Sequence, residues 1–363
     1  MTYFSDSIIK WHLKHGRKNL PWQGAQNPYA IWVSEIMLQQ TQVTTVIPYY
    51  HRFMQRFPDI ESLATANIDD VLHLWTGLGY YARGRNLHKA AQQIMDNHQG
   101  TFPTHIDDVM ALRGIGRSTA GAILSFAFSQ RQPILDGNVK RVLSRFFGVD
   151  GWYGKRTVAE KLWDLADQHT PEQEVAVYTQ AIMDFGATLC TRSKPHCAVC
   201  PIEHDCVARQ ENRIDELPGK KPKKAIPTKS CLMLIIQDNN NHILLLQRPP
   251  SGIWGGLWVP PQIDKILPDK TIIIEHVKHE FGIELTELEN GDAFRHTFSH
   301  YHLDIQPVFA SLSDTSITSS SINDDNSLWI DLQQPLQIGL PAPIKKLLES
   351  IHHNTHPRQR ELL

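Results

Sequence analysis

Four cysteines are concentrated in one short stretch of the sequence. The stretch reads CTRSKPHCAVCPIEHDC and contains Cys190, Cys197, Cys200 and Cys206, separated by six, two and five residues. Closely spaced thiolates suit a tetrahedral zinc ion or a four-iron cluster equally well, and disulfides are disfavoured in a reducing compartment. The fifth cysteine, Cys231, begins an apolar run and is most simply a small buried hydrophobe. The spacing therefore predicts a metal centre without deciding which metal it holds.

Two acidic residues have neighbours that could give them catalytic properties. Glu35 lies about one helical turn from Ile31, Trp32 and Leu38, so its face of a helix is apolar. Desolvation on such a face raises a carboxyl pKa and suits a general acid, whereas a partly buried glutamate paired with an arginine or a backbone N–H is the alternative. Asp136 precedes an apolar-periodic run, where it would be a helix N-cap worth about 1 kcal/mol.

A glycine-rich connection lies upstream of Asp136. The stretch LRGIGRSTAGAIL, Leu112 to Leu124, places Gly114 and Gly116 between two apolar-periodic segments. Glycines at such a turn let backbone N–H groups approach a phosphate at a helix N-terminus without reading bases. An ordinary helix–helix turn is the alternative.

The elements that must position these residues fall into two parts. From Ser5 to about Asn212, apolar residues recur at three- and four-residue spacings, which predicts helices, one of them from about Pro28 to Ile47 with a break at Pro48. The stretch LPGKKPKKAIPTK, residues 217–229, reads as an exposed linker.

A different texture follows the linker. SCLMLIIQD and HILLLQRP predict two paired strands, FSHYHLDIQPVFA a third, and TIIIEHVKHEFG a helix, so the second domain is predicted to be α+β. The residues 311–327 predict a Ser- and Asp-rich loop, and 351–363 a polar tail.

Length and charge agree with two domains. The chain has 363 residues and a net charge of −2, with 27 Lys and Arg against 22 Asp and Glu up to Lys229, and 9 against 16 beyond it. The mildly basic front half hints at a polyanion partner. The N-terminus predicts an amphipathic helix rather than a signal peptide, and no apolar run approaches the roughly 20 residues of a membrane span. We therefore expect a cytoplasmic protein without a membrane partner, acting as a monomer.

Several motifs together resemble a known family. The four-cysteine stretch resembles the iron–sulfur motif of the endonuclease III family, and a glycine hairpin followed by LDGNV is similar to the signature of that helix-hairpin-helix superfamily. SEIMLQQTQV resembles the catalytic helix of the adenine DNA glycosylases, which remove adenine mispaired with 8-oxoguanine. QRPPSGIWGGLWVPPQ and FRHTFSHYHLDI resemble their C-terminal Nudix-like domain.

The resemblance implies an architecture and a cofactor. It implies an all-α helix-hairpin-helix glycosylase domain at residues 1–216, with one [4Fe–4S] cluster on the loop 190–206, and an α+β Nudix-like domain at 230–350 that recognises 8-oxoguanine. The partner implied is double-stranded DNA containing an A:8-oxoguanine or A:G mispair.

The resemblance also assigns roles to single residues. Glu35 would protonate adenine N7, and Asp136 would stabilise the oxocarbenium ion formed as the base leaves. Positions expected to line the adenine pocket are Leu20, Trp22, Val43, Ser118 and Gln180. Positions expected to contact DNA are Gln40, Thr41, Gly114, Gly116, Asn138 and Lys140, with Leu78 and Tyr80 as a wedge near the lesion and Arg83 and Arg85 as phosphate contacts. The loop expected to read 8-oxoguanine is Phe298, Ser299 and His300, with Ser299 as its polar contact.

Two positions limit the chemistry that is expected. The lyase members of the superfamily carry a lysine where this chain has Ser118, so we predict a monofunctional glycosylase, with Lys140 able to trap an opened sugar adventitiously. In IIIEHVKHEFGIEL, Glu280 stands almost alone, so Nudix hydrolysis is expected to be lost. The alternatives are a pyrimidine-lesion glycosylase of the same superfamily, a nucleotide pyrophosphatase, and a non-catalytic iron–sulfur DNA-binding protein.

Overall fold

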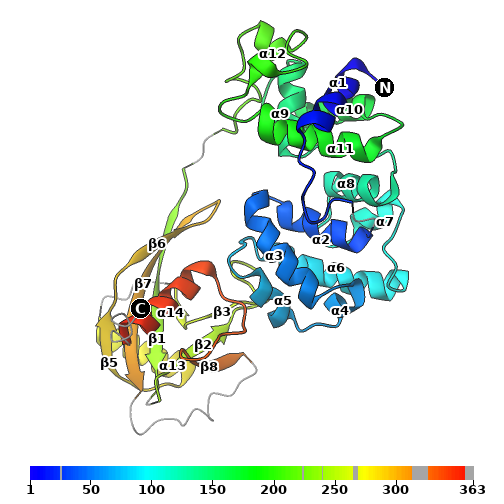
Figure 1. Ribbon diagram of the computed structural model, residues 1–363. Helices are drawn as coiled ribbons and strands as arrows, with labels where there is room; N and C mark the ends of the chain where they lie inside the picture. Colours follow the sequence, from blue (N-terminus) through cyan, green and yellow to red (C-terminus); the bar gives the residue numbers. More distant parts are fainter. Residues whose placement is uncertain (25–26, 223–224, 239, 265–268, 313–325, 356–363) are drawn as a thin grey trace, which may run out of the picture. The chain divides into compact units, whose positions relative to one another are not determined.

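A computed structural model describes residues 1–24, 27–222, 225–238, 240–264, 269–312 and 326–355 (Figure 1). The chain forms two compact units. The first combines Met1–Thr65 with Asn86–Lys223, and the second combines Ala66–Arg85 with Lys224–Leu363. In the described parts of the chain no helix is long and apolar enough to cross a membrane.

The first unit is helical, as predicted. It also contains a π-helical turn, Phe185–Leu189, and a short 3₁₀ turn, Cys197–Val199. Its α-helices, including most of α6, are α1 (Tyr3–His15), α2 (Pro28–Leu38), α3 (Val43–Arg56), α4 (Ile60–Ala64), α6 (Ala82–His98), α7 (Ile106–Ala111), α8 (Arg117–Phe128), α9 (Gly137–Phe146), α10 (Arg156–His169), α11 (Val175–Asp184) and α12 (Val207–Gln210).

A core built from α1, α9 and α11 holds one end of this unit together. Phe4 and Ile8 of α1 are buried with Val139 and Leu143 of α9 and with Ile182 of α11. Each fully buried side chain of this size contributes about 1.5–3 kcal/mol. Three of the four clustered cysteines pack against the same core, so α9 joins the residue at its N-terminus, Asp136, to the cysteine loop through one rigid element.

The predicted helix from Pro28 to Ile47 is wrong, because it is two helices. Helix α2 ends at Leu38 and α3 begins at Val43. Between them Gln40 has a φ of +59°, in the left-handed region that a helix cannot continue through. Pro48, predicted to break a helix, lies inside α3. It is the sixth residue of that helix, in the second turn, so the helix loses one backbone hydrogen bond there at a cost of roughly 3 kcal/mol. The burial of Val46, Tyr50 and Phe53 on the same helix offsets that cost.

The second unit is α+β, as predicted. Among the described residues an eight-stranded sheet has the order β3-β2-β1-β7-β5, with β4 beside β1, β6 beside β7 and β8 beside β2. Its helices are α5 (Ile68–Trp75), α13 (Lys270–Phe281) and α14 (Ala342–Thr355). Its strands are β1 (Thr228–Gln237), β2 (His242–Gln247), β3 (Trp258–Val259), β4 (Gln262–Ile263), β5 (Leu285–Asn290), β6 (Phe294–Thr297), β7 (His302–Leu312) and β8 (Ser327–Asp331).

The central pair of this sheet is parallel. Strands β1 and β7 run side by side from Thr228↔His302 to Gln237↔Ser311. The buried face of β1 carries Leu234 and Ile236, which pack with Val308 of β7 and Val277 of α13. The two predicted paired strands are β1 and β2, which are antiparallel, and the predicted helix is α13.

The predicted domain boundaries differ from the structure in three places. Strand β1 begins at Thr228, inside the predicted linker, and α14 continues to Thr355, inside the predicted tail. The remainder of that tail, 356–363, and most of the predicted loop, 313–325, lie outside the described residues. The segment Ala66–Arg85, expected within the helical domain, groups with the C-terminal unit instead.

Candidate active site

One cavity in the helical unit gathers most of the residues predicted to act in chemistry. Its volume is about 590 Å³, and its walls come from the segment before α2, from α2, α3, α8 and α11, and from the N-terminus of α9. The predicted residues that line it are Leu20, Trp22, Glu35, Gln40, Thr41, Val43, Ser118, Asp136, Asn138 and Gln180. The fold therefore joins positions that are as far apart in sequence as Leu20 and Gln180.

Glu35 is the acidic residue that α2 brings to this cavity. Its neighbours on the helix, Ser34 and Ile36, are buried. Burial raises the pKa of Glu35 to about 8, and the negative charge of Asp136 acts in the same direction. A carboxyl with this pKa holds its proton at neutral pH and can donate it.

Asp136 is the N-cap of α9, as the sequence predicts. Its Oδ1 accepts a hydrogen bond from the Val139 N–H at 2.8 Å, and its Oδ2 accepts one from Asn138 Nδ2 at 3.2 Å. Burial raises the pKa of Asp136, while these hydrogen bonds and the positive charge of Arg141 act in the opposite direction. The hydrogen bonds favour the anion of Asp136, whereas burial favours the protonated form of Glu35.

Ser118 and Gln180 are held in place by hydrogen bonds. The Leu135 N–H donates to Ser118 Oγ at 2.9 Å, directly before Asp136. Gln180 Nε2 donates to Asp184 Oδ1 at 2.9 Å. These bonds fix the wall of the cavity on either side of α9.

Sequence reasoning missed one residue of this wall, Arg17, and its buried partner Asp184. Arg17 lines the cavity, and both its backbone N–H and its guanidinium donate to Asp184, at 2.9 Å and 2.5 Å. Burial alone would raise the pKa of Asp184, but hydrogen bonds from His12 and Arg17 hold it below its usual range. The one signal in the sequence is that Asp184 follows Gln180 by four residues on α11, which places both on one face.

The glycine hairpin joins α7 to α8. Gly114 has a φ of +82°, in the region that favours glycine. Gly116 is the N-cap of α8 and offers no side chain to the first N–H groups of that helix. Farther along, the Lys140 ammonium lies 5.2 Å from the centre of the Tyr153 ring. The predicted DNA contacts of Gly114, Gly116 and Lys140 stay predictions.

The predicted wedge lies in the second unit, between α5 and α6. Tyr80 is 53% exposed, whereas Leu78 is buried at 5% exposure. The Arg83 guanidinium donates to the carbonyl oxygens of Gly79 at 3.1 Å and Leu78 at 3.4 Å, and burial lowers its pKa to about 10. In this structure Arg83 therefore supports the loop from within, as Arg85 does by donating to Gly255 O at 2.6 Å. Their phosphate contacts stay predictions.

The predicted reading loop connects β6 to β7. The Phe298 N–H donates to Tyr301 O at 2.9 Å, which closes the turn and leaves Ser299 and His300 exposed. The Phe298 ring packs against Trp254 at 5.4 Å and Tyr301 at 4.8 Å between ring centres. An exposed hydroxyl on a turn braced by aromatic rings can contact a base edge without much rearrangement.

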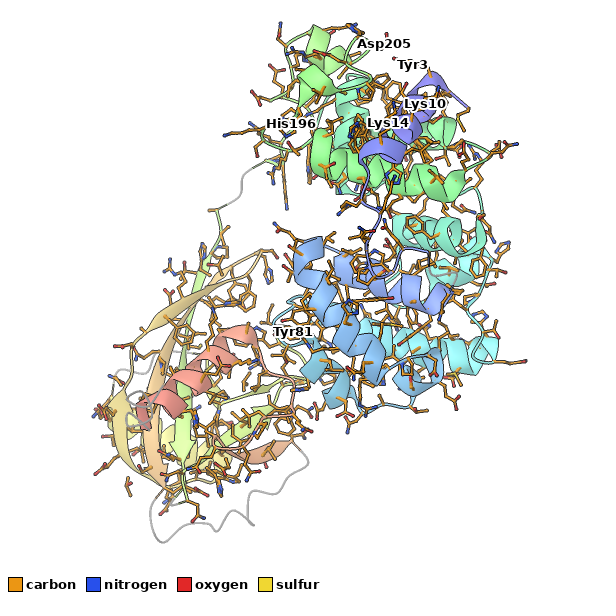
Figure 2. The ribbon with its side chains drawn as sticks, viewed as in Figure 1. Tyr3, Lys10, Lys14, Tyr81, His196 and Asp205 are labelled. Atoms are coloured by element: carbon orange, nitrogen blue, oxygen red, sulfur yellow. The ribbon has the colours of Figure 1, made fainter. Side chains whose placement is uncertain are left out.

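The four cysteines converge on one small pocket, which also has apolar walls. Cys190, Cys197, Cys200 and Cys206 all line it, and the negative charge of Cys190 raises the pKa of each of the other three thiols, although burial is the larger cause. His196 and Asp205, labelled in Figure 2, belong to this loop. In the described residues no three His, Cys, Asp or Glu side chains form a group that could hold a single metal ion.

Arg145 of α9 anchors the cysteine loop. Its side chain is buried, and it donates to the carbonyl oxygens of Thr191 at 2.7 Å and Arg192 at 3.0 Å, and to Cys190 Sγ at 3.4 Å. A buried cation needs negative charge nearby. Four thiolates around this pocket would supply that charge, so the donor set fits a thiolate-bound metal centre.

Comparison with known proteins agrees with this architecture. Residues 33–168 match the family model of the HhH-GPD superfamily base excision DNA repair proteins, and residues 232–350 match that of the NUDIX domain. A solved thermostable thymine-DNA glycosylase is 25% identical, with a TM-score of 0.53, and covers 57% of this chain and 95% of its own. A non-covalent endonuclease III–DNA complex, 22% identical with a TM-score of 0.50, shares the fold over 58% of this chain and 95% of its own.

Curated relatives narrow the assignment. An adenine DNA glycosylase from Buchnera aphidicola (Acyrthosiphon pisum) is 40% identical over 97% of this chain and 98% of its own length. The human adenine DNA glycosylase is 32% identical over 84% of this chain and 66% of its length. The chain therefore belongs to the adenine DNA glycosylases, hydrolases of base excision repair. The predicted family and fold class are confirmed.

Proposed function

We propose that this enzyme hydrolyses the N-glycosidic bond of adenine mispaired with 8-oxoguanine or guanine in double-stranded DNA, and leaves an abasic site with the strand intact. The observation that carries the proposal is the pair of carboxyls in one cavity. Glu35, whose pKa is raised to about 8, lines the same cavity as Asp136. The hydrogen bonds that Asp136 accepts favour its anion. Glycoside cleavage uses such a pair, one acid and one carboxylate.

In the proposed reaction each carboxyl has one task. Glu35 donates its proton to adenine N7, which turns a poor leaving group into a good one. As the glycosidic bond breaks, its electron pair leaves with the base, and the positive charge on the sugar is stabilised by the Asp136 carboxylate. Water then adds to the sugar carbon and loses a proton. Because neither carboxyl can reach these atoms in a stacked duplex, adenine must be flipped into the cavity.

The cavity walls suit a purine. Leu20, Trp22 and Val43 supply apolar surface, and Gln180 supplies an amide already oriented by Asp184. Gln40 and Thr41 lie on the turn between α2 and α3, where we propose that they probe the gap left by the flipped nucleotide. Gly114, Gly116, Asn138 and Lys140 are proposed to hold the backbone of the duplex.

The absence of an amine nucleophile at position 118 supports a monofunctional reaction. Ser118 occupies the position where lyases of the superfamily carry a lysine, and its hydroxyl is engaged by the Leu135 N–H. A Schiff base with the sugar therefore needs another amine. Lys140 is the candidate, and it would act slowly because the Tyr153 ring holds its ammonium.

Recognition of the lesion is proposed for the second unit. 8-Oxoguanine differs from guanine by a proton at N7 and an oxygen at C8, and Ser299 offers an exposed hydroxyl between Phe298 and His300 to read that edge. Leu78 and Tyr80 are proposed to wedge into the stack beside it.

One [4Fe–4S] cluster is proposed on Cys190, Cys197, Cys200 and Cys206. All four cysteines line one pocket, and their spacing resembles the iron–sulfur motif of the endonuclease III family. When bound, the cluster supplies a structural centre, since four cysteines leave no iron of a cubane open. Arg145 would offset its negative charge.

The function is tested by single-turnover adenine release from duplexes with one A:8-oxoguanine or one A:G pair. Alkali converts abasic sites into strand breaks, and the breaks are counted in samples with and without alkali. We expect adenine release from both, faster opposite 8-oxoguanine, with breaks that depend on alkali. Release of no adenine by the folded enzyme would refute the substrate, and equal breaks without alkali would refute the monofunctional reaction.

The cluster is tested by iron and acid-labile sulfide content, with absorbance near 400 nm. Cys200→Ser is expected to lose both, while the matched control Cys231→Ser, in strand β1, retains them. Zinc in place of iron in the wild type would refute the cluster. Since one copy holds every proposed residue, we also infer a monomer, so light scattering should give 41.4 kDa.

A further inference from the structure

The proposed wedge belongs by its contacts to the C-terminal unit, although it lies between helices of the N-terminal sequence. Ala66–Arg85 groups with Lys224–Leu363, and it contains α5 and the loop 77–80. We propose that Asp69, Thr76 and Tyr81 are positioning residues that fasten the wedge loop to the lesion-reading unit, so that recognition of 8-oxoguanine and insertion of the wedge are energetically coupled. This inference rests on the proposed function.

Asp69 seats the start of α5 on the sheet. Its Oδ1 accepts hydrogen bonds from Gln247 Nε2 at 3.1 Å and from Trp258 Nε1 at 3.3 Å. Gln247 is the last residue of β2, and Trp258 is the first residue of β3. One turn farther on, Leu72 packs tightly against Gly339, where an added Cβ would lie 2.7 Å from the Leu72 Cβ. Helix α5 therefore has little freedom to shift relative to β2 and β3.

Tyr81 fastens both ends of the wedge loop at one place. Its ring is buried, and its hydroxyl accepts a hydrogen bond from the Gly77 N–H at 3.3 Å and donates one to the Leu340 carbonyl at 3.0 Å (Figure 2). The Leu340 N–H in turn donates to Thr76 Oγ1 at 3.3 Å. The residue before the loop and the residue after it thus meet the same backbone segment, next to α14.

Side-chain hydrogen bonds hold the backbone of the loop 77–80. Gly77, Gly79 and Tyr80 have φ values of +98°, +77° and +49°. Trp75 Nε1 and Arg83 Nη2 both donate to the Gly79 carbonyl at 3.1 Å. A loop with its carbonyls engaged in this way moves with its anchors rather than independently of them.

A second line of contacts joins the wedge segment to the reading loop. Arg85 Nη1 donates to the Gly255 carbonyl at 2.6 Å. Gly255 follows Trp254, whose ring packs against Phe298 at 5.4 Å and His296 at 5.7 Å. Phe298 is the first residue of the proposed reading loop, so a contact of Ser299 with the lesion can bias the wedge through a continuous set of packed groups.

Tyr81→Phe is the sharpest test, because it removes one oxygen and two hydrogen bonds and keeps the ring. We measure the ratio of single-turnover adenine release opposite 8-oxoguanine to that opposite guanine, at subsaturating enzyme. The ratio is expected to fall about tenfold, with little change for the A:G duplex. The matched control is Tyr29→Phe, which deletes a buried hydroxyl that donates to the Phe57 carbonyl at 2.7 Å in the helical unit. Its ratio should stay at the wild-type value.

Coupling is tested by adding Ser299→Ala to Tyr81→Phe. If the two sites are coupled, the ratio measured for the double variant should be no lower than the ratio measured for the Ser299→Ala variant. Additive losses, an unchanged ratio in Tyr81→Phe, or an equal loss in Tyr29→Phe would overturn the inference. Should Tyr81→Phe fail to fold, Asp69→Asn takes its place with the same expectation. A wild type that releases no adenine from either duplex defeats the proposed function instead, and so distinguishes the two failures.

Discussion

The cavity of the helical unit and the reading loop of the C-terminal unit place polar groups in opposite environments. In the cavity, Glu35 and Asp136 are half-buried in the wall, and both have raised pKa values. On the loop, Ser299 is exposed, and the neighbouring polar residues have solvent beside them. A carboxyl that donates a proton near neutral pH needs a raised pKa, which burial supplies, whereas recognition of a base edge requires only a placed hydroxyl.

The C-terminal unit matches the NUDIX domain model, but its helix α13 carries few acidic residues. They are Glu275 and Glu280. A divalent cation on a pyrophosphate needs several carboxylates on that helix. The loss of Nudix hydrolysis stays a prediction, and it agrees with the proposal that this domain serves recognition.

The largest effect is expected at Glu35, the proposed proton donor of the cavity. Glu35→Gln keeps the size of the side chain and removes its transferable proton, so single-turnover adenine release should fall by about 10²–10⁴, with duplex affinity retained in an electrophoretic mobility shift. Retention of more than a tenth of the wild-type rate would remove Glu35 as the acid.

Asp136→Asn should have a smaller effect and lower the rate of single-turnover adenine release by about 10²–10³. Asparagine caps a helix as well as aspartate does, so α9 and the melting temperature are expected to be little changed while the negative charge is lost. A large fall in melting temperature would show that Asp136 acts mainly through the fold.

The pH dependence follows from the raised pKa of Glu35. Because the protonated form is the acid, adenine release should fall about tenfold per pH unit above pH 8. A flat profile from pH 7 to 10 would contradict the assignment.

The raised pKa of Glu35 should also make the stability of the protein depend on pH. In the unfolded chain the Glu35 carboxyl releases its proton near the ordinary glutamate pKa of 4.5, while the folded state keeps the proton to about pH 8. The stability that Glu35 contributes is therefore full below pH 4.5 and is lost as the pH rises to 8. Glu35→Gln should melt above the wild type at pH 8 and close to it at pH 4.5.

The smallest effect is expected at the reading loop. Ser299→Ala should lower the preference for 8-oxoguanine over guanine about tenfold, the cost of one base contact, and leave release from A:G unchanged. Thr297→Ala, at the end of β6 on the same hairpin, serves as the control. A loss equal for both duplexes would indicate that the loop holds DNA without reading the lesion.

The local sequence determined the parts that depend on neighbouring residues. The periodicity of the first two hundred residues predicted the helices, the alternation of FSHYHLDIQPVFA predicted β7, and the position of Asp136 before an apolar run predicted the cap of α9. Such patterns failed at Gln40, because a left-handed residue that is not glycine leaves no mark in them. They also failed at Pro48, because the burial of other side chains of α3 outweighs the cost of a proline inside the helix.

Tertiary structure decided everything that depends on contacts between distant segments. Sequence could propose Glu35 and Asp136 separately, but only the packing of α2 against α8, and of α8 and α9 against α11, puts both carboxyls in one cavity, where burial raises their pKa values. The hold of Asp184 on Arg17, and the attachment of Ala66–Arg85 to the C-terminal unit, follow from hydrogen bonds across 167 and 259 residues of chain. Periodicity describes a residue's own element, whereas pKa values and anchoring arise from what the fold brings to that element.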